Sequence, residues 1–299
     1  MKRRILDGDF LDRLDAASLV LKTAMTGFFG GTRKARTYGN TVEFADFREY
    51  APGDDIRRID WNVFARTEKF FIKLFTDERQ MQNHILIDCS GSMACGNPEK
   101  ATAALKIAAA FGYLSVTSMD RVAYKLIKGD VAEGLGITIT NKDSFYRAAQ
   151  KLESVDFEGD ADLEKAIVNM ESPGHDDGLT IIISDFLTES NWKKAIDFLM
   201  YQKREILMIQ VLSPDEFYPD FDGRINLIDS ESVDMADARN MRMIVKKKLI
   251  KAYQKAFDEY EQELVDFCAS RNVTFFTVLS DEPVEKVIFG KGYETEMIK

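Results

Sequence analysis

The sequence predicts an α/β protein with a Rossmann-like, doubly wound and mainly parallel sheet. From residue 83 onward, short apolar runs alternate with helical patterns, the order that joins parallel strands through helices. The runs are rich in Ile, Val and Leu, as expected for strands covered on both faces. A length of 299 residues allows one large α/β domain or two modest ones.

The first 80 residues have a different pattern. Apolar side chains recur on one face of residues 9–25, which predicts a helix. Residues 36–80 show no helical period, and residues 69–75 alternate like a strand. We therefore expect an N-terminal helix and an irregular β-rich segment over residues 1–80, followed by the α/β domain over residues 81–299.

The apolar runs and helical stripes place the elements of the α/β domain. We expect strands at residues 84–88, 121–127, 179–184, 205–212 and 273–279, with shorter extended pieces at 134–140 and 224–229. Helices are expected at residues 99–118, 143–152, 162–170, 191–202 and 240–269, the fourth of them capped by Asn191.

Composition and charge exclude several classes of protein. The net charge of −10 argues against nonspecific nucleic-acid binding, which needs clustered Lys and Arg. No apolar run approaches the roughly 18 residues of a membrane span, and the N-terminus lacks the apolar core of a signal peptide. Three cysteines without a regular spacing read as reduced thiols. These features together predict a cytoplasmic protein.

Oxygen-bearing side chains follow two of the predicted strands. Asp88, Ser90 and Ser92 alternate directly after the first, and Asp185 follows the strand at 179–184. Because the carboxyl ends of parallel strands meet at one edge, these groups are expected to converge. One or two carboxylates with hydroxyls and water suit Mg²⁺ or Mn²⁺. Alternatively, the serines only cap the next helix, and Asp88 only closes a turn.

A charged segment precedes the sheet, over residues 48–66. Arg and Asp side chains alternate there around Tyr50 and Trp61. The segment could form a partner or regulatory surface. The interpretation we favour is a buried ion-pair network that fixes the segment to the sheet domain, because opposite charges a few residues apart suit self-pairing.

The motifs resemble two known groups. Asp88-x-Ser90-x-Ser92, followed later by an Ile-Ser-Asp strand, resembles the von Willebrand factor type A domain and its metal-ion-dependent adhesion site. The preceding segment resembles the bacterial family called domain of unknown function 58. The residues that carry this second resemblance are Gly39, Glu43-Phe44, Arg48-Glu49-Tyr50, the run from Pro52 to Trp61, and Ala65-Arg66. The match covers roughly residues 10 to 280.

The sequence departs from the adhesion-site pattern in its third loop. The resemblance implies a threonine ligand where this chain has Ala161, within Gly159-Asp160-Ala161-Asp162-Leu163. An alanine methyl cannot bind a metal. Asp160 or Asp162 could replace the threonine after a small shift, or water could fill the position.

The leading expectation is a non-enzymatic protein-interaction module with a divalent cation at Asp88, Ser90, Ser92 and Asp185. The resemblance implies a MoxR-type AAA+ ATPase as partner, with this chain as adaptor or co-chaperone. A metal-free structural scaffold and a metal-dependent hydrolase using Asp88 and Asp185 are the alternatives. The hydrolase is disfavoured because no nucleophile or base accompanies these residues in the sequence. Gly-x4-Gly-Lys-Ser/Thr and Gly-x-Ser-x-Gly motifs are also absent.

Overall fold

The computed structural model divides the chain into two compact units. One unit comprises Met1–Val20 together with Met81–Lys299, and the other comprises Leu21–Gln80. The residues whose structure is described are 3–6, 8, 10, 12–16, 43–51, 54–76, 81–170, 178–188, 190–219, 223–227, 241–245, 247–287 and 290. Residues 1–20 therefore cluster with the α/β unit rather than with the segment that follows them.

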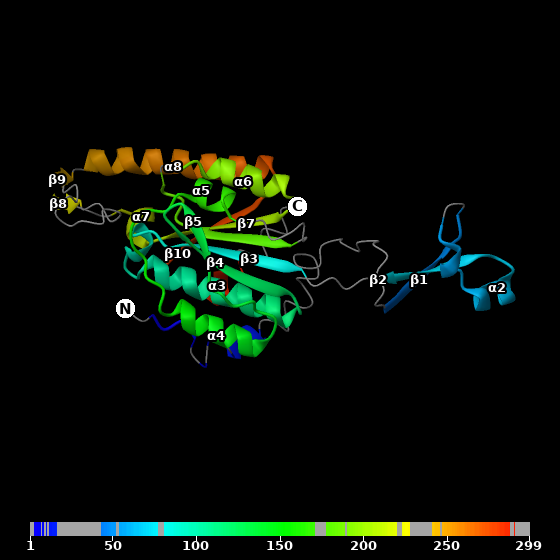
Figure 1. Ribbon diagram of the computed structural model, residues 1–299. Coiled ribbons are helices and arrows are strands. Elements are labelled where there is room, and N and C mark those ends of the chain that lie inside the picture. Colours follow the sequence, from blue (N-terminus) through cyan, green and yellow to red (C-terminus); the bar gives the residue numbers. More distant parts are fainter. Residues whose placement is uncertain are drawn as a thin grey trace. The chain divides into compact units, whose positions relative to one another are not determined.

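A six-stranded sheet forms the centre of the larger unit (Figure 1). Its strands are β3 (Gln82–Asp88), β4 (Arg121–Lys128), β5 (Val131–Gly134), β6 (Leu179–Ser184), β7 (Glu205–Leu212) and β10 (Thr274–Leu279). Their order across the sheet is β10-β7-β6-β3-β4-β5. All neighbours are parallel except β4 and β5, which form an antiparallel edge. This order is that of a doubly wound sheet, so the predicted fold class is confirmed.

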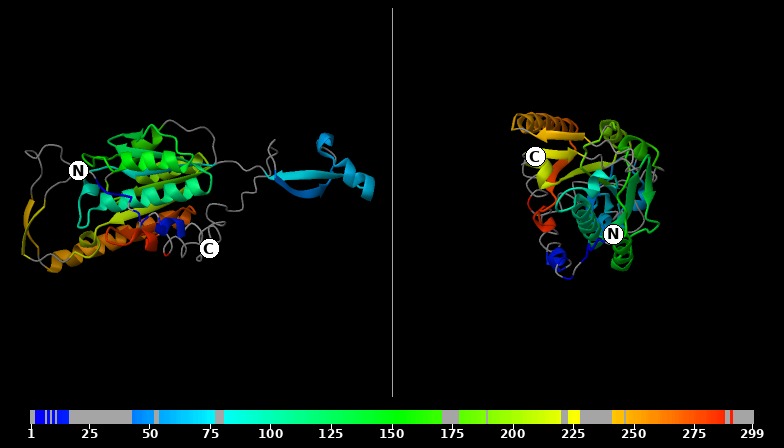
Figure 2. Two further views of the ribbon diagram at one scale, coloured as in Figure 1. Left: turned by 90° about the horizontal axis from the view of Figure 1, so that it is seen from below. Right: turned by 90° about the vertical axis from the view of Figure 1, so that its left-hand side faces the viewer.

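Helices cover both faces of the sheet (Figures 1 and 2). On one face, α3 (Lys100–Thr117) lies against the strands and α4 (Lys142–Leu152) packs beside it. The other face carries α5 (Leu163–Val168), α6 (Trp192–Tyr201) and α8 (Lys247–Ser270), whose apolar side chains form one buried cluster with β3, β6 and β7. None of the helices in the described ranges is long and apolar enough to cross a membrane.

Close packing of α3 on the sheet depends on small side chains. Alanines fill much of its inward face, and Gly112 lies opposite the buried Tyr124 of β4. A Cβ atom at Gly112 would lie 1.9 Å from the Tyr124 hydroxyl, which donates to the Ala108 carbonyl at 3.1 Å. The glycine therefore allows the helix to approach the strand closely.

The smaller unit contains an antiparallel pair of strands, β1 (Glu43–Glu49) and β2 (Phe71–Thr76). A short 3-10 helix, η1 (Ile56–Arg58), and the helix α2 (Trp61–Thr67) lie between them in the sequence. Asp60 caps α2 by accepting from the backbone of Asn62 and Val63. Within this unit, Arg48 forms an ion pair with Asp54 at 2.8 Å, and both side chains are partly exposed. These two members of the charged segment therefore pair with each other.

The structure corrects four details of the predicted elements. Residues 241–245 form the strand β9, paired with β8 (Gly223–Leu227), so the predicted helix 240–269 begins at Lys247. Of the extended piece expected at 134–140, only residue 134 belongs to a strand, β5 at 131–134, and Ile139 forms an isolated bridge with Val122. The stretch 36–80, expected to lack helix, contains α2. Asn191 precedes α6 but its side chain makes no capping hydrogen bond. Of the predicted N-terminal helix 9–25, residues 17–25 lie outside the described residues.

Candidate functional site

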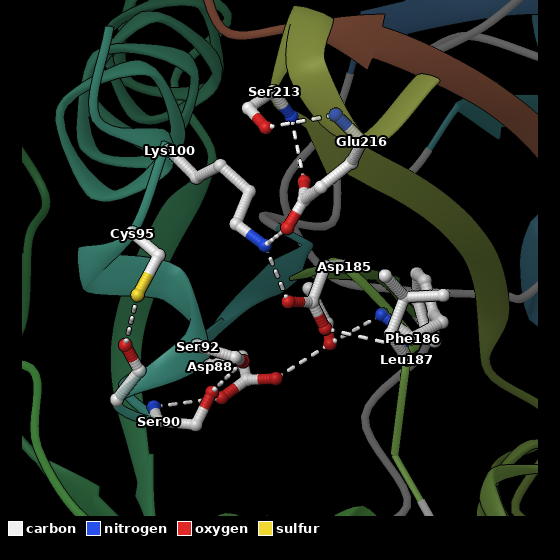
Figure 3. A network of polar contacts seen from close by, with 12 residues as sticks. Asp88, Ser90, Ser92, Cys95, Lys100, Asp185, Phe186, Leu187, Ser213 and Glu216 are labelled. Atoms are coloured by element: carbon white, nitrogen blue, oxygen red, sulfur yellow. Dashed lines mark hydrogen bonds and ion pairs between the residues drawn. The ribbon is translucent and has the colours of Figure 1, made fainter. Parts of the chain in front are cut away.

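The carboxyl ends of β3, β6 and β7 place polar groups at one edge of the sheet. Ile87 of β3 pairs with Ile183 of β6, so Asp88 lies beside Ser184 and close to Asp185. In Figure 3, Asp88, Ser90 and Ser92 lie on one side of Asp185, and Lys100 lies on the other. The parallel strand order therefore brings the predicted residues of two loops together.

Asp88 is a buried carboxylate held by neutral donors. Its Oδ2 accepts from the Ser184 hydroxyl at 2.5 Å, and its Oδ1 accepts from the Ser90 backbone N–H at 2.9 Å. Among the described residues, no Lys or Arg forms an ion pair with it. Burial, together with the negative charge of Asp185, raises the pKa of Asp88 to about 6. The site therefore holds a negative charge that a bound cation would stabilise.

Ser90 and Ser92 present their hydroxyls together. The two Oγ atoms hydrogen-bond to each other at 3.0 Å. Ligands about 2.1 Å from an octahedral Mg²⁺ and at right angles to each other are about 3.0 Å apart, so this spacing suits two neighbouring ligands. The two serines are separated by Gly91, where the chain turns into the short 3-10 helix η2 (Ser92–Ala94).

The Asp88–Ser92 loop is tied to the third loop of the site. Gly91 N–H donates to the Gly159 carbonyl at 2.8 Å, and Glu158 N–H donates to the Cys89 carbonyl at 3.0 Å. Met93, fully buried, anchors the start of η2. These contacts hold the backbone of the Asp88–Ser92 loop in position.

Asp185 is bound by groups of the protein itself. Its Oδ2 forms an ion pair with Lys100 Nζ at 2.8 Å, and its Oδ1 accepts from the Leu187 backbone N–H at 3.1 Å. Gln210 of β7 donates to its backbone carbonyl at 3.2 Å. Asp185 lies at the edge predicted by the sequence, but its carboxylate is occupied by a buried ammonium.

Lys100 is fully buried and bridges two carboxylates. Besides Asp185, its Nζ contacts Glu216 Oε1 at 2.5 Å. Glu216 belongs to α7 (Pro214–Phe217), where Ser213 and Glu216 form a reciprocal capping box. Burial lowers the pKa of Lys100, but the two carboxylates outweigh burial and the net shift is upward, so the side chain is a cation.

The third loop supplies no side-chain ligand. Ala161 is buried and its backbone bridges to Gly129. Asp160 is exposed, and its Oδ1 accepts from its neighbour's backbone N–H at 2.7 Å. Asp162 caps α5 through Lys165 N–H at 3.0 Å and pairs with the Lys165 ammonium at 2.9 Å. The structure therefore assigns Asp162 a capping role and leaves the threonine position without an oxygen ligand.

Side-chain oxygens of the kind that bind a divalent cation lie close together at the first loop. Asp88, Ser90 and Ser92 offer three oxygens of the kind that Mg²⁺ prefers, with room in its coordination for water. Asp185 is paired with Lys100, and the side chain of Ala161 has no oxygen. No group of three or more His, Cys, Asp and Glu side chains in the described part of the chain is arranged to hold a metal.

Sequence reasoning missed Lys100, Glu216 and Ser184. Lys100 precedes Ala104 by four residues and so lies on the inward stripe of the predicted helix, where a lysine signals a buried partner. Glu216 follows Ser213 by three residues, which is a capping-box spacing. Ser184 is part of the Ile-Ser-Asp motif at the end of β6, but the motif alone does not show that its hydroxyl donates to Asp88.

The comparisons identify the family of this chain. Residues 46–261 match the family described as Protein of unknown function DUF58. The chain belongs to this family. Relatives include Uncharacterized protein Mb1516 of Mycobacterium bovis and Uncharacterized protein Rv1480 of Mycobacterium tuberculosis. Each is 29% identical over 238 residues, which covers 76% of this chain and 74% of the relative.

Among solved structures, this DUF58 chain is similar to the conserved hypothetical protein BatB of Bacteroides thetaiotaomicron. That similarity covers 73% of this chain and 99% of BatB at 12% identity, with a TM-score of 0.45. The chain is also similar to a von Willebrand factor type A protein of Catenulispora acidiphila. That similarity covers 48% of this chain and 35% of the other chain, at 14% identity and a TM-score of 0.36. The strand order itself gives the DUF58 chain a doubly wound, mainly parallel sheet.

Proposed function

We propose that this DUF58 chain is a protein-interaction module that holds Mg²⁺ or Mn²⁺ with Asp88, Ser90 and Ser92. One observation carries the proposal: a buried carboxylate that pairs with no Lys or Arg of the described residues lies beside two hydroxyls at the spacing of neighbouring metal ligands. The ion would supply the positive charge that Asp88 lacks and an open position for an outside oxygen.

The three chain ligands leave half of the ion's charge uncompensated. Asp88 contributes one negative charge, and the two serine hydroxyls are neutral. A metal held this way attracts a further carboxylate, as expected for a site that binds an acidic side chain of another protein. The role of the chain's own residues is to position the ion at the sheet edge, through the bonds of Asp88 to Ser184 and of Gly91 to Gly159.

We further propose a MoxR-type AAA+ ATPase as the partner class, with this chain as adaptor or co-chaperone. The family resemblance of the segment from Gly39 to Arg66 supports this choice of partner. The acidic group that binds the metal would come from the ATPase. The test is co-purification of the two proteins with Mg²⁺ and with a chelator, and the complex is expected to be lost when the ion is removed.

Calorimetric titration of Mg²⁺ and Mn²⁺ tests the metal site. The wild type is expected to release or absorb heat on binding, and Asp88→Ala is expected to give dilution heat only. Asp258→Ala is the matched control, because Asp258 is an exposed aspartate of α8. Equal heats from wild type and Asp88→Ala would leave the metal-free scaffold as the better description. Phosphoester turnover that disappears in Asp88→Ala would favour the hydrolase.

A further inference from the structure

A buried ammonium occupies the carboxylate that the sequence predicts as a metal ligand. Lys100 begins α3 and is fully buried, with its Nζ 2.8 Å from Asp185 Oδ2 and 2.5 Å from Glu216 Oε1. Figure 3 shows its side chain reaching from α3 to the gap between Asp185 and Glu216. The Lys100 ammonium therefore already neutralises the charge of Asp185.

The contacts of Asp185 limit what else its carboxylate can bind. One oxygen pairs with Lys100 and the other accepts from the Leu187 backbone N–H. A metal that recruits Asp185 must displace the ammonium from it, leaving Lys100 with Glu216 as its one remaining carboxylate. Because a buried charge loses stability when a partner is removed, the ammonium opposes that displacement.

We propose that Lys100 competes with a divalent cation for Asp185 and so restricts the metal's protein ligands to Asp88, Ser90 and Ser92. The inference rests on the proposed function, since it concerns which side chains bind the metal at the same site. Lys100 is thus a positioning residue: it sets how many carboxylates the metal receives. With one carboxylate instead of two, the chain binds the metal more weakly, and the metal attracts a partner's acidic group more strongly.

Calorimetric titration of Mn²⁺ into the full chain tests the competition. Lys100→Met releases Asp185 and is expected to bind Mn²⁺ at least about tenfold more tightly than the wild type. Asp185→Asn, in which Lys100 keeps Glu216, is expected to bind as the wild type does, within about twofold. In Lys100→Met/Asp185→Asn the gain should disappear. Lys106→Met is the control, because Lys106 is a half-exposed lysine of the same helix.

Thermal unfolding gives a second readout. Lys100→Met leaves two carboxylates without their cation, so its midpoint is expected to be lower than that of the wild type and to rise more on addition of Mn²⁺. If Lys100→Met does not fold, Lys100→Gln replaces it, because its amide still donates a hydrogen bond.

The outcomes separate this inference from the proposed function. Mn²⁺ binding by wild type that is lost in Asp185→Asn would keep the metal site but overturn the competition. The competition is also overturned if the gain persists in Lys100→Met/Asp185→Asn, because Asp185 would then not be its source. Binding by the lysine variant alone would support the competition and refute metal binding by the native site. No binding by either protein would overturn both proposals.

Discussion

His84 is expected to make the protein sensitive to acid. It lies in the middle of β3, is 1% exposed, and neither ring nitrogen has a hydrogen-bond partner among the described residues. Burial, with the positive charges of Arg204 and Lys125, lowers the pKa of His84 from 6.5 to about 3. The folded protein therefore keeps this imidazole neutral where the unfolded chain protonates it.

The sign and size of the effect follow from proton linkage. Below pH 6.5 the unfolded state binds a proton that the folded state does not, so the free energy of unfolding falls as the pH falls towards 3. Each pH unit in this window corresponds to about 1.4 kcal/mol. At pH 5, His84 is expected to lower stability by about 2 kcal/mol relative to pH 7.

The substitution His84→Phe tests this directly. Phenylalanine retains an aromatic ring but has neither a titrating group nor an unpaired N–H. The free energy of unfolding at pH 7 is therefore expected to be about 1–3 kcal/mol higher than that of the wild type. The advantage over wild type should widen by a further ~2 kcal/mol at pH 5. Urea unfolding at both pH values measures the difference, and the contribution of His175 cancels because both proteins contain it.

The change with pH is the decisive quantity. A packing mismatch of the larger ring would alter stability equally at both pH values. An advantage of His84→Phe that is the same at pH 7 and pH 5 would refute the reasoning, since it would mean that His84 titrates normally in the folded protein.

Three further outcomes follow from the structure. Asp88→Asn without metal is expected to raise the midpoint of thermal unfolding, because it removes a buried negative charge whose pKa is already raised; a lower midpoint would show that the Ser184 bond outweighs the charge. Gly112→Ala should destabilise by about 1–3 kcal/mol in urea unfolding, because its methyl group overlaps the Tyr124 hydroxyl; unchanged stability would contradict the close packing of α3. Ser213→Ala should cost about 1 kcal/mol by loss of the α7 cap; an equal loss in the exposed control Ser118→Ala would remove this explanation.

The sheet could be predicted from the sequence because its strands are chemically distinct. Residues 179–184 and 205–212 are apolar runs of strand length, and the structure assigns them the same bounds. The strand at 241–245 could not be recognised, because Met241–Val245 continues the apolar spacing of the following helix and its partner, β8, comes from a separate segment. Helix α2 has only seven residues, fewer than a periodic pattern needs to be recognised.

The candidate site was predictable in position but not in its charge balance. Asp88 and Asp185 follow strands, so topology alone brings them to one edge. Pairing of Lys100 with Asp185 joins residues 85 positions apart and depends on the angle at which α3 meets the sheet. Alternation along a single segment contains no information on that angle, so the ion pair between Lys100 and Asp185 could not be predicted.

Electron paramagnetic resonance of Mn²⁺ tests the central claim most directly, because free and protein-bound Mn²⁺ give different spectra. The wild-type chain is expected to bind one Mn²⁺ per molecule and to release it to a chelator. Asp88→Ala is expected to leave the Mn²⁺ free. Wild-type protein that leaves all Mn²⁺ free, or Asp88→Ala that binds it as tightly as wild type, would contradict a cation site formed by Asp88, Ser90 and Ser92.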